Sequence, residues 1–225
     1  MDQHIKREIS SHAPDLRIAR ILIIIFFSVG ITGMILPVTR NFFIILIPLA
    51  LIISFLALAL FHKPVNLKKE LLAFSTIFIV SFAIEAVGVN TGRIFGTYSY
   101  GKGLGIKLFN TPFLIGLNWV MLVYCTSVIA ERLKVHALLK ILASSLLMVL
   151  YDIVMEQLAP EMRMWSFAGG VVPMANYISW FAIAFVFHSF LRVTDMKLIN
   201  RIAGFIFAVQ LSFFVFLGIF FKFLR

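Results

Sequence analysis

The sequence has few charged residues and few acidic ones in particular. Of its 225 residues 13% are charged, and ten of these are Asp or Glu. Soluble domains carry about 25% charged and about 45–50% apolar residues, whereas 61% of this chain is hydrophobic and its mean hydropathy is +1.02. This composition excludes a soluble enzyme and a disordered chain. It predicts a single integral membrane domain over residues 1–225.

Cysteine is nearly absent, and histidine is dispersed. The one cysteine, Cys125, lies inside an apolar run, which excludes an intrachain disulfide and a cysteine-based metal site. No histidine is spaced three or four residues from another histidine, so no histidine-based metal site is expected. The five histidines are His4, His12, His62, His136 and His188.

The formal net charge is +10, which on a soluble protein would indicate nucleic-acid binding. Here the twenty lysines and arginines lie between apolar runs, where such residues anchor loops at lipid headgroups. The sequence contains no basic helix, zinc pattern or aromatic sheet motif, so nucleic acid is not an expected partner.

Seven apolar segments are long enough to cross a bilayer as helices, which requires about 20 residues each. Because the runs are continuous rather than alternating, membrane strands are not expected. The predicted fold class is an all-α, polytopic bundle of about seven transmembrane helices. The predicted spans are 16–36, 41–61, 71–89, 112–130, 137–158, 173–191 and 200–224.

The flanking lysines and arginines predict the orientation of the bundle. Thirteen of them fall in the N-terminal tail and the even-numbered links, and seven fall on the other side. About twenty polar or mixed residues precede the first run, which lacks an Ala-x-Ala end, so we expect this run to remain as a span. The chain is predicted to be a multi-pass protein of the cell (inner) membrane with a cytoplasmic N-terminus.

Three acids, Glu85, Asp152 and Glu156, lie within apolar segments. An ionisable group at the centre of a membrane helix costs about 2.5–3.5 kcal/mol on insertion scales, so such residues are candidates for function. The alternative is a structural hydrogen bond between helices. Asp152 and Glu156 are four residues apart, which places them on one face of a helix.

The predicted spans bring these acids to one depth. The third and fifth spans end near them, on the outer side of the membrane, and the fourth and sixth spans start from that side with polar and aromatic residues. Scattered structural residues would not need to agree in depth. On the fourth and sixth spans, the polar and aromatic residues near the outer side are Asn118, Trp119, Asn176, Tyr177 and Trp180.

Two unusual loops flank this cluster. Residues 91–105 contain five glycines together with Tyr98 and Tyr100, which favours tight turns and close backbone approach. The run from Gly96 to Lys102 nearly matches a phosphate-binding loop, but a glycine follows the lysine and no strand precedes it, so nucleotide binding is rejected. The second loop, 160–173, contains Trp165, for which an aromatic belt at the membrane interface is the alternative.

Carboxyl groups in an apolar, aromatic cavity suit acid chemistry on a lipid-like substrate. Burial favours the protonated form of a carboxyl group, which can donate a proton to an electron-rich alkene. Aromatic faces stabilise the resulting tertiary cation, by about 2 kcal/mol or more when desolvated. A second carboxylate can then position water or remove a proton. Hydration and cyclisation of isoprenoids share this first step.

The stretch 81–190 resembles the bacterial and archaeal carotenoid-biosynthesis membrane protein family, which includes the membrane-type carotenoid 1,2-hydratases. The chain has Trp165-Ser166-Phe167 where a Trp-x-Trp pair is expected. The matching residues are Glu85, Gly88, Gly92, Phe95, Gly96, Tyr98, Tyr100, Gly105, Pro112, Gly116, Asn118, Trp119, Asp152, Glu156, Pro160, Trp165, Pro173, Asn176, Tyr177 and Trp180.

The resemblance implies an acyclic, lycopene-like carotenoid in the bilayer as the substrate. It implies addition of water to the terminal 1,2 double bond by a cofactor-independent hydratase, a hydro-lyase of isoprenoid metabolism. Other enzymes of the carotenoid pathway could be partners. Our own assignment from the residues makes Glu85, Asp152 and Glu156 catalytic. The expected substrate-binding residues are Tyr98, Tyr100, Asn118, Trp119, Trp165, Asn176, Tyr177 and Trp180.

Two alternatives stay open at this point. A cyclase or isomerase would use the same cation and lose a proton instead of adding water. A transporter or a non-catalytic carotenoid-binding protein would leave the pigment unchanged. Transporters often have inverted repeats and midplane sites, and the sequence has neither an evident repeat nor a central polar cluster.

Overall fold

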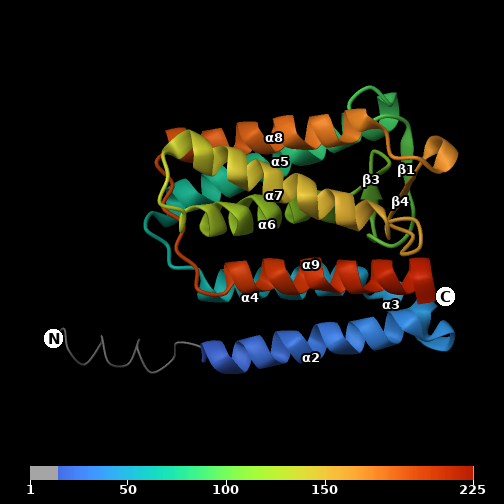
Figure 1. The fold of residues 1–225 in the computed structure, drawn as a ribbon. Helices are drawn as coiled ribbons and strands as arrows, with labels where there is room; N and C mark the ends of the chain where they lie inside the picture. Colours follow the sequence, from blue (N-terminus) through green and yellow to red (C-terminus); the bar gives the residue numbers. More distant parts are fainter. Residues whose placement is uncertain (1–14, 225) are drawn as a thin grey trace.

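The computed structural model describes residues 15–224 as helices joined by short links, with two small pairs of strands at one end (Figure 1). Predictions on residues 1–14 and 225, among them those on His4, Lys6, Arg7 and His12, lie outside this range. The elements are α2 (Leu16–Ile35), α3 (Pro37–Ile45), α4 (Ile47–Phe61), α5 (Leu67–Thr91), β1 (Tyr98–Tyr100), β2 (Lys107–Leu108), β3 (Thr111–Pro112), α6 (Leu114–Ala130), α7 (Ala137–Glu156), β4 (Trp165–Phe167), η1 (Ala168–Gly170), α8 (Met174–Val193), α9 (Ala203–Ile219) and η2 (Phe220–Leu224).

Local sequence accounts for several helix ends. The Asp15 carboxylate accepts hydrogen bonds from two backbone N–H groups in the first turn of α2, and the Asn66 side chain accepts one in the first turn of α5. Both residue types are favoured N-caps. Helix α5 ends at Gly92, whose φ of 67° lies in the left-handed region that glycine adopts without strain. The chain then turns into the glycine-rich loop.

The fold is an all-α helical bundle, as predicted. Five helices are long and apolar enough to cross a membrane, namely α2, α5, α7, α8 and the segment Ala203–Phe223 that contains α9. The pair α3–α4 passes the same test as one broken span, and α6 is a shorter apolar helix of 17 residues. These units correspond one by one to the seven predicted segments.

The second predicted span is wrong as a single straight helix. The predicted link at 37–40 is already helical in α3, and α3 and α4 are bent by 55° between Ile45 and Ile47. Pro48 explains the break, because proline lacks an N–H donor and its ring clashes with the carbonyl four residues earlier.

Helix α6 occupies the centre of the bundle. Most of its residues are buried, and it packs against α4, α5, α7, α8 and α9. In Figure 1, α5–α8 form one layer, α9 and α4 lie below it, and α2 lies on the far side of α9. A helix enclosed by other helices on every side can carry polar groups that face a protein interior instead of lipid.

The two unusual loops are joined by an antiparallel pair of strands. Strand β1 pairs with β4, so that Tyr98 lies opposite Phe167 and Tyr100 opposite Trp165. These four aromatic residues are buried, whereas the serines between them are exposed, which is the alternation expected of a strand with one buried face. The pairing directs the tyrosines and Trp165 into the end of the bundle.

Candidate active site

Glu85 is buried near the end of α5, among aromatic donors from two other elements. Its Oε2 atom accepts hydrogen bonds from the hydroxyls of Tyr98 and Tyr100, at 2.8 and 2.7 Å. Its Oε1 atom accepts one from the indole Nε1–H of Trp119 on α6, at 2.9 Å. Three donors aimed at one carboxyl group provide the environment of a stabilised carboxylate.

Asp152 and Glu156, on successive turns of α7, form a pair of carboxyl groups next to Glu85. The Asn176 side-chain amide on α8 donates to Asp152 Oδ2 at 2.7 Å and to Glu156 Oε1 at 3.3 Å. Trp165 in β4 donates its Nε1–H to Glu156 Oε2 at 2.8 Å. One amide therefore bridges the two acids, and the loop after α7 supplies the remaining donor.

Asp152 is fully buried, and within residues 15–224 its Oδ1 is the one side-chain oxygen or nitrogen that is completely shielded from solvent and has no hydrogen-bond partner. A small cavity of about 10 Å³ lies nearby, and both Glu85 and Glu156 line it. About 10–15 Å³ is the least space that holds a water molecule. Carboxyl groups from α5 and α7 thus face one hollow of about that size.

Aromatic rings enclose this hollow. Trp119 on α6 and Trp180 on α8 stack with their ring centres 4.3 Å apart and their planes at 24°. Tyr100 meets Tyr98 and Trp165 edge to face. The same side chains that donate hydrogen bonds to the acids therefore also present ring faces and edges to the cluster.

The two tyrosine hydroxyls remain protonated. Burial, followed by the adjacent Glu85 carboxyl, raises the pKa of Tyr98 and that of Tyr100 far above the usual value near 10. A raised phenol pKa means that the neutral form is favoured. Both hydroxyls can therefore donate to Glu85 throughout the physiological pH range.

A larger apolar cavity of about 240 Å³ lies beside the acid cluster. Ile115 and Trp165 line both cavities, so the two are neighbours. The larger cavity is bordered by α2, α3, α4, α6, α7 and α9, and methionines such as Met155 and Met162 contribute to its wall. A flexible methionine lining adapts to irregular apolar ligands.

The structure brings together nine of the eleven residues predicted for the site. Asn118, on α6 next to Trp119, instead lines the large cavity and makes no side-chain hydrogen bond within the described residues. Tyr177 is half-buried beside Asn176 and has no such bond in that part of the chain either. The nine are Glu85, Tyr98, Tyr100, Trp119, Asp152, Glu156, Trp165, Asn176 and Trp180.

Sequence reasoning missed two polar residues of the large cavity, Tyr151 and Gln210. Gln210 is a polar side chain inside a long apolar run, and this is the same criterion that singled out the three acids. It would therefore have identified Gln210 as well. Tyr151 directly precedes Asp152 in the sequence, but aromatic residues are common in membrane helices, so its residue type alone gives no signal.

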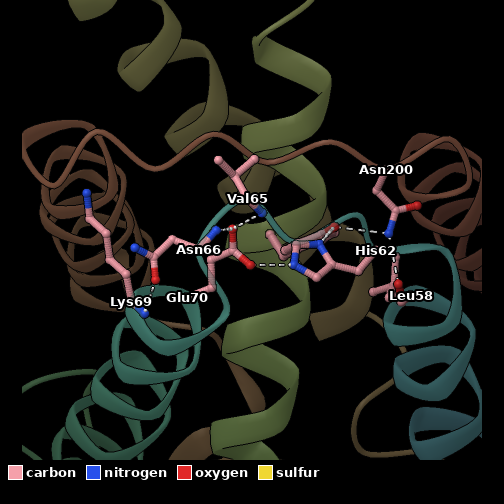
Figure 2. Close-up of polar contacts among 8 residues, drawn as sticks. Leu58, His62, Val65, Asn66, Lys69, Glu70 and Asn200 are labelled. Atoms are coloured by element: carbon pink, nitrogen blue, oxygen red, sulfur yellow. Dashed lines mark hydrogen bonds and ion pairs between the residues drawn. The ribbon is translucent and has the colours of Figure 1, made fainter. Parts of the chain in front are cut away.

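A second buried polar cluster lies at the opposite end of the bundle, where Figure 2 shows His62 between Glu70 and Asn200. His62 Nε2 lies 2.9 Å from Glu70 Oε2, and His62 Nδ1 lies 2.8 Å from the hydroxyl of Tyr124. Asn200 donates to the same hydroxyl at 3.0 Å and to the Leu58 carbonyl at 2.8 Å. These bonds tie together the α4–α5 link, α6 and the α8–α9 link. The spacing of eight residues between His62 and Glu70 hid this contact from pattern analysis.

The chain matches a family model described as "carotenoid biosynthesis protein" over residues 40–224. This range is wider than the stretch 81–190 that carries the motifs. It covers α4 to α9 and includes the small cavity and the wall of the large cavity except for the residues of α2. No curated protein and no solved structure matches the chain.

Proposed function

The chain belongs to the carotenoid biosynthesis protein family, and from this premise we propose that it hydrates the terminal 1,2 double bond of an acyclic carotenoid. A role in carotenoid biosynthesis and a membrane-embedded helical fold follow from the family and the helices. The observation that carries the finer proposal is the small cavity lined by both Glu85 and Glu156 and enclosed by aromatic rings.

The Asp152–Glu156 pair is the proton donor in this proposal. Two buried carboxyl groups that share the Asn176 amide are best accommodated when one of the two is protonated. Asp152 Oδ1, which lacks a partner within the described residues, is a position for that proton. Transfer of the proton to the terminal CH carbon of the double bond leaves a tertiary cation and a carboxylate.

Glu85 is the base. Its three hydrogen bonds from Tyr98, Tyr100 and Trp119 favour the charged form. A negative carboxylate and the stacked indoles of Trp119 and Trp180 stabilise the cation. Water held between Glu85 and Glu156 then adds its oxygen to the cation and gives one proton to Glu85, which returns it across the shared cavity to the acid pair. The sum is alkene plus water to tertiary alcohol.

The test is expression in a lycopene-producing host, after which the pigments are separated and their molecular masses are measured by mass spectrometry. We expect a product heavier than its substrate by one water. Glu85→Gln and Asp152→Asn should each lower product formation by a factor of about 100 or more, the range for loss of a general acid or base. Protein in the membrane fraction is quantified in every strain.

Glu131→Gln is the matched control. Glu131 is an exposed acid that pairs with Lys140 at 2.7 Å, outside the acid cluster, so this variant should make product at the wild-type level. A product of unchanged mass would contradict hydration and favour a cyclase or isomerase. Unaltered pigment with the protein present would favour a non-catalytic carotenoid-binding or transport protein.

For the cellular setting, we propose that the protein spans the cell (inner) membrane with its N-terminus in the cytoplasm. The excess of lysine and arginine in the N-terminal tail and in the links α4–α5, α6–α7 and α8–α9 supports this orientation. It puts the acid cluster toward the outer leaflet. Other enzymes of the pathway are proposed as partners, because substrate and product both stay in the bilayer.

A further inference from the structure

The large apolar cavity contains three polar side chains that the hydration chemistry does not use. They are Asn118 on α6, Tyr151 on α7 and Gln210 on α9, and each lines the cavity from a different helix. Their exposed fractions are 7%, 3% and 6%. All three are thus more than nine-tenths buried, in an enclosure whose other walls are almost entirely apolar.

None of these three side chains has a hydrogen-bond partner within residues 15–224. None is a fully enclosed orphan of the kind found at Asp152 Oδ1, and all three side chains border the open space of the cavity. Buried amides and hydroxyls are nearly always hydrogen-bonded, and an unpaired one is unfavourable. Three such groups around one cavity are the arrangement that fixes the orientation of a ligand in an apolar site.

The chemistry of the lining limits the ligand. A carboxamide both donates and accepts hydrogen bonds, and so does a phenol. No lysine, arginine or acid among the described residues lines this cavity, which disfavours a charged group such as a phosphate or carboxylate. A neutral hydroxyl or carbonyl oxygen on an apolar chain satisfies the lining.

We propose that this cavity binds an acyclic isoprenoid chain that carries a neutral oxygen, held by Asn118, Tyr151 and Gln210. The proposal rests on the proposed function for the isoprenoid nature of the chain. It goes further in assigning the oxygen a site, so that the protein distinguishes an oxygenated isoprenoid from a plain hydrocarbon. Because Ile115 and Trp165 line both cavities, the cavity that holds the oxygen adjoins the acid cluster.

The test is equilibrium binding to the purified full-length protein in lipid nanodiscs, with two tritium-labelled probes. The first probe is all-trans geranylgeraniol, an acyclic C20 isoprenoid alcohol. The second is the C20 hydrocarbon of the same skeleton without the hydroxyl. We expect the alcohol to bind about tenfold more tightly than the hydrocarbon, the effect of one well-made buried hydrogen bond.

Two conservative variants locate the effect. Tyr151→Phe removes a single oxygen atom, and Gln210→Met keeps the length of the side chain. Each should reduce the preference for the alcohol several-fold and leave hydrocarbon binding unchanged. Gln157→Met is the control, because Gln157 is an exposed residue at the end of α7 that does not line the cavity; it should retain the full preference.

Equal affinity for both probes in the wild-type protein would overturn the proposal, and so would failure of the alcohol to bind. Full preference in Tyr151→Phe and in Gln210→Met would also overturn it. Should Gln210→Met fail to fold, the wild-type comparison and Tyr151→Phe still decide. Binding requires no turnover, and Glu85→Gln should keep the preference while losing hydration. The failure of this proposal and the failure of the hydratase proposal are therefore separate results.

Discussion

At the scale of the residue, each donor to Glu85 is also an aromatic ring. Tyr98, Tyr100 and Trp119 hold the carboxyl group through O–H and N–H bonds, and their rings form part of the wall around it. An amide or a lysine could supply the same hydrogen bonds but would bring polar surface or charge to the place where a hydrocarbon cation is proposed to form. Tyrosine and tryptophan combine a hydrogen bond with an apolar face.

Tyr100→Phe tests this double role. The ring and its contacts remain, while Glu85 Oε2 loses its 2.7 Å hydrogen bond. A hydrogen bond to a charged group contributes about 1.5–3 kcal/mol, so we expect product formation in the pigment assay to fall by a factor of about 10 to 100.

Tyr124→Phe is the control for Tyr100→Phe, because it removes a buried hydroxyl that belongs to the separate cluster of His62 and Asn200. Per molecule of folded protein, it should make product at the wild-type rate. An unchanged rate in Tyr100→Phe would show that the Tyr100 hydroxyl is not needed to hold Glu85.

At the scale of the element, the glycine-rich loop is explained by close packing and not by a phosphate. The backbone N–H of Gly101 donates to the Met164 carbonyl at 2.8 Å, and that of Gly103 donates to the Arg163 carbonyl at 2.7 Å. A Cβ atom at either glycine would collide with the backbone at Arg163. The glycines thus let the two loops approach closely enough to form β1–β4, which places Trp165 against Glu156.

The break between α3 and α4 also has a consequence for the site. Both halves, together with residues near the bend such as Leu46 and Ile47, line the large cavity. A straight helix over 41–61 would present one continuous face. The 55° bend between Ile45 and Ile47 instead lets the short α3 and the longer α4 border the cavity at different angles.

The cluster around Tyr124 should stabilise the junction of three elements. Tyr124→Phe removes the partner that His62 and Asn200 share, and we expect the free energy of unfolding to fall by about 1–3 kcal/mol. Thermal unfolding of the purified protein in detergent measures this. Tyr177→Phe, a half-buried tyrosine without a side-chain hydrogen bond in the described chain, should unfold like the wild type. Equal stability of the two variants would contradict a structural role for the cluster.

At the scale of the whole molecule, the chain puts its two polar clusters at opposite ends of the bundle. The loops that carry the acid site lie at one end in Figure 1, and the links α4–α5, α6–α7 and α8–α9 lie at the other. The second group is richer in lysine and arginine. The proposed orientation therefore places the links α4–α5, α6–α7 and α8–α9 in the cytoplasm and the loops of the acid site on the outer side.

Cysteine labelling tests this orientation in intact cells. Val171, in the loop before α8, and Val135, in the α6–α7 link, have exposed fractions of 73% and 42%. A membrane-impermeant maleimide should label Val171→Cys but label Val135→Cys only after the cells are broken. The native Cys125 is buried, so the wild type is a control with little background. Labelling of Val135→Cys in intact cells would reverse the proposed orientation.

The sequence by itself determined the class of the protein and the depth of its acids. Apolar run length is a local property, and the cost of placing a charge in lipid acts on each helix separately. Seven segments and the shared level of Glu85, Asp152 and Glu156 could therefore be predicted without knowing how the helices pack.

Only the tertiary structure decided which groups meet. The partners of a side chain depend on the rotation of each helix about its axis and on the packing of loops distant in sequence, which local periodicity does not specify. The structure thus directs Asn176 to both acids of α7, turns Asn118 toward the apolar cavity with Gln210, and brings His62 to Glu70 across eight residues. Helix packing, not composition, creates the cavities in which the chemistry is proposed to occur.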